Sequence, residues 1–187
     1  MENNNEVVFV DVDYDQPALY DYFKQLDTSM LEDTSITYRE QFPDFPGDTI
    51  WELKQWLTTQ GRRDPLKGDH ERLDIIAHPD HEHPSIKPIL DQLAEREWKI
   101  GLVTFFKQKN GEDVPAHVDY PYRKGSLLML PIIHNEFQLT DAVTYYQDGG
   151  SYRVESPCIM NVMKIHGVKN VNGDRLMLHI ELPEMTL

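Results

Sequence analysis

The chain is poor in cysteine and in long hydrophobic runs. Cys158 is the single cysteine among 187 residues, so no disulfide can form within the chain and a disulfide-stapled scaffold is excluded. The opening MENNNEVVFV lacks the basic segment and the long apolar run of a secretion signal, and no later stretch reads as a membrane span. We therefore expect a cytoplasmic protein in a reducing compartment, with no membrane as partner.

Basic residues are scarce as well. The 18 lysines and arginines face 32 aspartates and glutamates, which gives a formal net charge of −14, and no local basic cluster interrupts the acidic excess. Such a surface repels phosphate backbones and anionic lipid headgroups. We expect a small-molecule or peptidyl substrate, neutral or cationic, and no nucleic acid as partner.

Hydrophobic residues make up 40% of the chain and aromatic residues 10%, which is typical of a globular fold. The length fits one domain, 1–187. The pattern changes near residue 98: residues 1–97 carry helical signals, whereas residues 98–182 carry short strand-like runs separated by turns. Many short strands after a helical portion indicate an antiparallel sandwich or barrel with helices against one side.

Three helices are expected in the N-terminal portion. The first follows Asp15, which can cap a segment with apolar residues at helical spacing. The second spans PGDTIWELKQWL, where Thr49 and Glu52 match a capping box and Gly61 ends the helix. The third begins at Ser85. The apolar faces of the first and third helices contain Leu19, Tyr22, Phe23, Leu26, Ile86, Ile89, Leu90, Leu93 and Ala94.

The last expected strand, DRLMLHIEL, has one wholly apolar face and one mixed face. Leucines and an isoleucine alternate with Arg175, Met177, His179 and Glu181. If the apolar face is simply the buried one, Arg175 lies in solvent. If helices cover the sheet from outside, the apolar face points outward and Arg175 points into the barrel, where its charge needs an anionic partner.

Eight histidines offer nitrogen ligands for a metal. The conspicuous run HPDHEHP, with His78, His81 and His83, contains two prolines and no regular scaffold. We interpret it as a solvated loop, or a loop on the substrate side, rather than a metal site. Three further histidines have no partner visible in the sequence and are interpreted as structural: His70, His134 and His179.

His117 and Asp119 are better candidates for metal ligands than the histidines of HPDHEHP. On a strand, residues two positions apart project from the same face, so VPAHVDYPY directs an imidazole and a carboxylate toward one point. Divalent iron is held by two imidazoles and one carboxylate, which leave open positions for other ligands. The third candidate ligand is His166 in MKIHGVKN, and Arg175 follows it across an Asn-Gly turn.

The ordered set His117-x-Asp119, His166 and Arg175 resembles the Fe(II)/2-oxoglutarate-dependent oxygenases over residues 98–182. The resemblance implies a mainly β fold with flanking helices: a double-stranded β-helix, the jelly roll of cupins, with the helical portion packed on its outer sheet. It implies that His117, Asp119 and His166 are the catalytic iron ligands and that Arg175 binds the distal carboxylate of 2-oxoglutarate. The implied cofactor is Fe(II), with 2-oxoglutarate and dioxygen as cosubstrates.

Within that superfamily, the nine-residue step from His166 to Arg175 is similar to that of prolyl and aspartyl/asparaginyl hydroxylases. This implies hydroxylation of an unactivated C–H bond in an amino acid or a peptidyl residue. The downstream arginine pair of the nucleic-acid demethylases is absent, and Met177 stands where another branch has a serine. The second contact to 2-oxoglutarate, a hydroxyl, stays open among Tyr120, Tyr122 and Ser126.

Two other classes of protein stay open. A cupin-like metalloenzyme would bind its metal without 2-oxoglutarate, and such proteins usually add a further histidine or glutamate ligand. A non-catalytic β-sandwich for binding or assembly would keep His117, Asp119 and His166 apart. Uptake of iron and of 2-oxoglutarate distinguishes the three classes.

Overall fold

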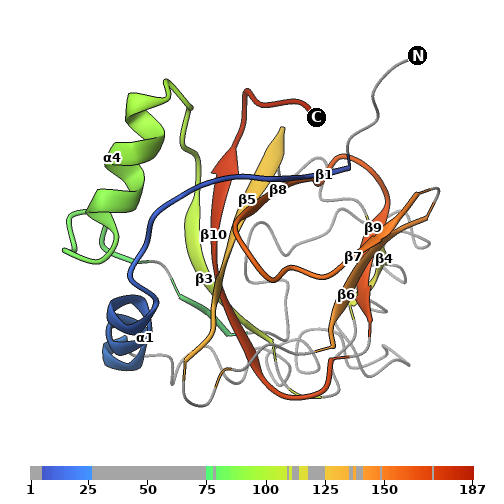
Figure 1. Ribbon diagram of the computed structural model, residues 1–187, viewed down its shortest axis with the longest axis horizontal. Coiled ribbons are helices and arrows are strands. Elements are labelled where there is room, and N and C mark those ends of the chain that lie inside the picture. The colour runs from blue at the N-terminus through green and yellow to red at the C-terminus, as the bar shows by residue number, and fades with distance from the viewer. Residues whose placement is uncertain are drawn as a thin grey trace, which may run out of the picture.

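The computed structural model describes residues 6–26, 75–77, 79–108, 110, 114–117, 125–134, 137, 141–147, 149–169 and 171–187, and within these ranges it leaves out the side chains of 75–77, 115 and 117. Across these residues, two antiparallel β-sheets face each other and two helices lie on one side (Figure 1). The expected second helix, PGDTIWELKQWL, lies outside the described residues.

The larger sheet runs in the order β1-β8-β5-β10-β3-β2, and its neighbouring strands are antiparallel. β10 is the longest described strand and pairs on both sides, with β3 and with β5. The bounds are β1 (Val7–Phe9), β2 (Ile75–Ala77), β3 (Val103–Gln108), β5 (Ser126–Ile132), β8 (Cys158–Asn161) and β10 (Arg175–Leu182).

The smaller sheet runs in the order β4-β9-β6-β7. From β3 to β10 the chain passes back and forth between the two sheets, and only the β6–β7 hairpin stays within one of them. This order is that of a double-stranded β-helix, so the expected mainly β jelly roll is confirmed. The bounds are β4 (Val114–His117), β6 (Val143–Tyr146), β7 (Ser151–Tyr152) and β9 (His166–Lys169).

Two helices cover the face of the larger sheet that points away from the smaller one (Figure 1). Helix α1 (Gln16–Gln25) begins as expected, because the Asp15 carboxylate accepts a hydrogen bond from the Ala18 amide at 3.0 Å. Helix α4 (Lys87–Glu95) does not begin as expected. Ser85 is not its cap: Ile86 holds that position without a side-chain hydrogen bond, and the Ser85 hydroxyl instead contacts Nδ1 of His83 at 2.7 Å.

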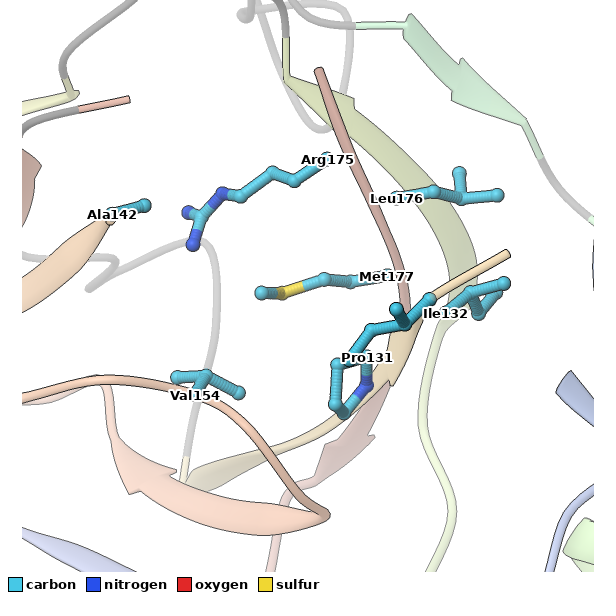
Figure 2. Close-up of a pocket in the computed structure, with 8 residues that line it drawn as sticks. Pro131, Ile132, Ala142, Val154, Arg175, Leu176 and Met177 are labelled. Atoms are coloured by element: carbon cyan, nitrogen blue, oxygen red, sulfur yellow. The ribbon is translucent and has the colours of Figure 1, made fainter. Parts of the chain in front are cut away.

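The alternation along β10 divides the protein into two cores. Its apolar face packs against α1 and α4, whereas Met177 belongs to a separate cluster between the sheets. Figure 2 shows Arg175 and Met177 extending to one side of β10 and Leu176 to the other. The interpretation that placed Arg175 inside the barrel is therefore confirmed. The apolar face consists of Leu176, Leu178, Ile180 and Leu182.

The N-terminal portion, residues 1–97, also contributes strands, which the sequence analysis did not anticipate. β1 and β2 form the two edges of the larger sheet and contain three residues each. Runs this short show no reliable alternation, so their strand character depends on pairing with β8 and β3.

No helix within the described ranges is long and apolar enough to cross a membrane.

We expect Leu178→Ala to lower the free energy of unfolding by about 2–5 kcal/mol, because it opens a cavity where β10 meets the helices. Leu178 is fully buried, whereas Leu102 is 38% exposed and serves as the matched control. Urea unfolding of Leu178→Ala and Leu102→Ala measures both changes. Equal losses in the two variants would contradict a core centred on the outer face of β10.

Candidate functional site

A pocket that opens to solvent lies between the two sheets. Its walls come from both sheets and are largely apolar, with a few polar side chains among them. This composition is typical of small-molecule sites, in which a few placed polar groups orient the ligand. The polar side chains are Thr144, His166, Arg175 and His179, and the apolar ones are Phe106, Val114, Leu127, Met129, Met160 and Val168.

His166 is the first residue of β9, and its side chain is buried. Its Nδ1 atom lies 2.8 Å from the carbonyl oxygen of Lys164. A carbonyl oxygen can only accept, so Nδ1 carries the proton and Nε2 of the neutral ring carries the lone pair. A ring held through one nitrogen by a backbone carbonyl is the usual arrangement of a metal-binding histidine.

The strand pairing brings a second predicted ligand position next to His166. β4 and β9 are antiparallel, and the Cα atom of His117 lies opposite that of His166, after an irregularity in the pairing that begins at Val114. Asp119 and the side chain of His117 lie outside the described residues. Among the side chains that are described, no three histidines, cysteines or carboxylates come together as a metal site. The three-residue ligand set stays a prediction.

Arg175 is the first residue of β10, and only 8% of it is exposed. It lies directly opposite Gln108 of β3, and its Nε atom donates to Oε1 of Gln108 at 2.6 Å. Arg175 also lines a neighbouring pocket, where it extends toward Ala142 (Figure 2). The guanidinium therefore lies inside the barrel and borders both pockets.

The turn before Arg175 is tied to the end of β3. The Gly173 amide donates to Oδ1 of Asn110 at 2.7 Å, and the Asn110 amide donates to Oδ1 of Asp174 at 2.9 Å. Gly173 has a φ of 99°, a conformation that side chains rarely allow, and the chain bends there. Lys107 adds an ion pair with Asp174 at 3.3 Å. These contacts hold the start of β10, and with it Arg175, against β3.

Three polar residues of the inner face were not predicted from the sequence to belong to the site. Gln108 carries no motif, and its role depends on strand register. Thr144 is buried on β6 and lines the cavity. His179, interpreted above as structural, lines the same cavity and stacks on Phe106 with ring centroids 4.7 Å apart. His179 and Arg175 lie an even number of positions apart on one strand and therefore share a face. The sequence thus indicated that the two side chains point to the same side of the sheet.

The candidate hydroxyl contacts to 2-oxoglutarate are only partly described. Ser126 shares the outward direction of Leu128 and Leu130, and its hydroxyl donates to the carbonyl oxygen of Met185 at 3.0 Å. Ser126 is therefore turned away from the cavity. Tyr120 and Tyr122 lie outside the described residues.

Among the other described histidines, His83 and His134 pack against aromatic rings. The His83 ring stacks on Tyr22 with centroids 3.5 Å apart, and His81 is exposed, which fits the interpretation of this segment as a loop. His134 bridges to Phe137 through its backbone and meets the ring of Tyr20 edge-on. His70 and His78 lie outside the described residues.

The single cysteine cannot serve as a nucleophile in this site. Cys158 is fully buried on β8, and burial raises the pKa of its thiol to about 12. The thiol therefore stays protonated at neutral pH, and the thiolate that covalent catalysis needs is not formed.

Comparisons with known proteins return solved structures only. No family model matches the sequence, and no curated protein matches it. A prolyl hydroxylase from Trichoplax adhaerens, in complex with a hypoxia inducible factor oxygen degradation domain peptide fragment, has a TM-score of 0.47 and 13% identity over 97% of this chain and 86% of that chain.

Two further solved structures are similar over part of the chain. A viral collagen prolyl hydroxylase from Paramecium Bursaria Chlorella virus-1, in complex with 2-oxoglutarate, has a TM-score of 0.46 and 11% identity over 71% of this chain and 87% of that chain. An RmlC-like cupin from Desulfovibrio desulfuricans has a TM-score of 0.36 and 13% identity over 64% of this chain and 92% of that chain. Likenesses at this level identify neither a family nor an activity, since one fold carries many activities. Function has to be argued from the side chains.

Gly167, next to His166, lies where β9 closely approaches β4. A Cβ atom at this position would lie 2.6 Å from the carbonyl oxygen of Val114 and 2.6 Å from Oη of Tyr145. We expect Gly167→Ala to lower the free energy of unfolding by about 1–3 kcal/mol, because β9 has to move away from backbone that cannot yield. Urea unfolding measures the loss. In the control Gly150→Ala, the nearest contacts are with the end of the Tyr152 side chain, so a loss as large there would contradict the argument.

Proposed function

We propose that this protein is an Fe(II)- and 2-oxoglutarate-dependent dioxygenase that hydroxylates an unactivated C–H bond of an amino acid or a peptidyl residue. One observation carries the proposal. His166 and Arg175, assigned from the sequence to the metal and to the diacid, come from different sheets and line the same cavity. We also propose that 1–187 is one oxygenase domain, with 98–182 as its β-helix core.

His166 supports the proposed metal site on the smaller sheet. His166 has the tautomer that a ligand needs, because the Lys164 carbonyl holds the proton on Nδ1. The backbone pairing brings His117 opposite His166, and Asp119 follows two positions later in the sequence. We assign the metal to these three residues. Iron and 2-oxoglutarate, when bound, supply oxidation of a C–H bond to an alcohol by dioxygen, coupled to decarboxylation of 2-oxoglutarate to succinate.

Arg175 fits the distal carboxylate of 2-oxoglutarate. A guanidinium is planar, keeps its charge when buried and binds a carboxylate through two parallel hydrogen bonds. The surrounding walls include Phe106, Leu127 and Met160, and apolar walls strengthen such a charged contact. The role of this chain is thus to bind, orient and dehydrate the reactants.

The preference for an amino acid or peptidyl substrate follows from the nine-residue step between His166 and Arg175, which is similar to that of prolyl and aspartyl/asparaginyl hydroxylases. The net charge of −14 adds a preference for neutral or cationic substrates. A screen of free amino acids and peptides for stimulated release of succinate would identify the substrate.

Anaerobic titration with Fe(II) and then with 2-oxoglutarate tests the proposed function. We expect a visible charge-transfer band, because the 2-oxo acid chelates the bound metal. We expect no band in His166→Ala, with an unchanged melting temperature. Iron uptake without the band in the unmodified protein would favour the cupin-like metalloenzyme, and no iron uptake would favour the non-catalytic scaffold.

Arg175→Ala should weaken the binding of 2-oxoglutarate by about tenfold or more, because it removes a charge-assisted contact in a buried site. The dissociation constant from the same titration measures this. Arg153 pairs with Asp141 on the surface, where 44% of its side chain is exposed, and Arg153→Ala is the matched control that should bind normally. Unchanged affinity in Arg175→Ala would reject its assigned role.

A further inference from the structure

We infer that Tyr146 is a positioning residue for the proposed metal ligand His166, and that the N-terminal segment holds Tyr146 in place through Glu6. The inference rests on the proposed function, because it assigns both residues a role toward the metal site. Glu6 lies outside residues 98–182, the part of the chain that carries the resemblance to oxygenases. The N-terminal portion thus supports the site as well as covering the larger sheet.

Tyr146 and His166 meet across the pairing of β6 with β9. Their Cα atoms lie opposite each other, so both side chains project from one face of the smaller sheet. Their ring centroids lie 5.9 Å apart, with an angle of 45° between the ring planes. Both residues are buried, with 4% of Tyr146 and 5% of His166 exposed. The phenol ring therefore packs beside the imidazole and limits where the imidazole can turn.

The direction of the His166 ring matters because a metal binds to the lone pair of Nε2. The hydrogen bond from Nδ1 to the carbonyl oxygen of Lys164, at 2.8 Å, fixes the other nitrogen. One hydrogen bond alone does not prevent a ring from pivoting about that contact, and a buried neighbour at its side restricts the pivot. Metal ligands have to stay within about 10–20° of the productive geometry, so such a neighbour affects metal affinity.

Tyr146 is itself fixed at its hydroxyl end. The hydroxyl donates to two carbonyl oxygens of the larger sheet, that of Glu6, just before β1, at 2.9 Å and that of Asn161, at the end of β8, at 3.1 Å. Burial raises the pKa of Tyr146 above its ordinary value, so the hydroxyl keeps its proton at neutral pH and stays a donor. Tyr146 thus spans from the smaller sheet to the larger one.

The Glu6 carboxylate contacts the two turns that flank the tyrosine and the histidine. Its Oε2 atom accepts hydrogen bonds from the Gly150 amide at 2.9 Å and the Tyr152 hydroxyl at 3.1 Å, which hold the turn after β6. Its Oε1 atom lies 3.8 Å from Nζ of Lys164, the residue whose carbonyl holds His166. Only 9% of the Glu6 side chain is exposed, so water and salt screen these contacts little.

Two substitutions of Tyr146 separate the ring from its hydroxyl. Tyr146→Phe keeps the ring, whereas Tyr146→Leu removes both. Tyr145→Leu is the matched control, because Tyr145 is the preceding residue of β6 and points to the opposite face of the sheet. Glu6→Ala removes the carboxylate, and Glu155→Ala is its control at a position where 52% of the side chain is exposed.

Each protein is titrated with Co(II), which is stable in air and has a visible spectrum that depends on the number and arrangement of its ligands. His166→Ala gives the background of Co(II) bound elsewhere, and circular dichroism gives the melting temperature. A residue with only a structural role would change the melting temperature and leave the affinity and the spectrum of bound Co(II) unchanged.

We expect both controls to bind Co(II) as the unmodified protein does. Tyr146→Leu should weaken Co(II) binding by about tenfold or more and change the spectrum, because residues that orient a metal ligand have effects of this size. Tyr146→Phe and Glu6→Ala should each weaken it by about threefold or more, the effect of losing at least one hydrogen bond that holds the ring.

Unchanged affinity and spectrum in Tyr146→Leu would overturn the inference, and if that variant does not fold, the same result in Tyr146→Phe would overturn it. An equal loss in Tyr145→Leu would also reject a specific role for Tyr146. Normal binding in Glu6→Ala would reject the role of the N-terminal segment. Uptake of Co(II) by the unmodified protein no greater than by His166→Ala would reject the proposed metal site, whereas the other outcomes reject the inference alone.

Discussion

The structure depends on the alternation of side chains along β10. Because successive residues of a strand point to opposite faces, one strand supplies leucines to the core under α1 and α4 and polar residues to the barrel. A shift of register by one residue would exchange these two sets. The leucines would then point into the barrel, and Arg175 would lie under the helices. The packing of the helices on the outer face therefore also determines where the candidate site lies.

This arrangement makes a buried arginine tolerable. Removing a guanidinium from water costs several kcal/mol unless hydrogen bonds replace its solvent contacts. Gln108 provides one such bond. Two further hydrogen bonds link Asn110, just after β3, to Gly173 and Asp174, just before β10, and hold the two strands together beside the pair. The larger sheet thus holds the side chain of Arg175 inside the barrel.

The features predicted correctly from the sequence are those with a local physical cause. Alternation predicted β10 and its two faces, with the direction of Arg175 depending on which face the helices cover, and a carboxylate before a helical repeat predicted the start of α1 at Asp15. The start of α4 was predicted wrongly because the Ser85 hydroxyl has a nearby competitor, His83, for its hydrogen bond. Gln108 was missed for a different reason: it acquires its role only through a partner 67 positions away in the chain, and no local pattern encodes strand register.

The two halves of the candidate site come from different sheets. His166 belongs to the smaller sheet and Arg175 to the larger one, so the distance between them depends on the side chains that separate the sheets. Those side chains include Leu127, Met129 and Met160, which pack between the sheets and line the cavity at the same time. Under the proposed function the diacid has to reach from the smaller sheet to Arg175, so a change in the volume of these side chains would alter ligand selectivity as well as stability. In this fold the inner core and the specificity of the site are set by the same residues.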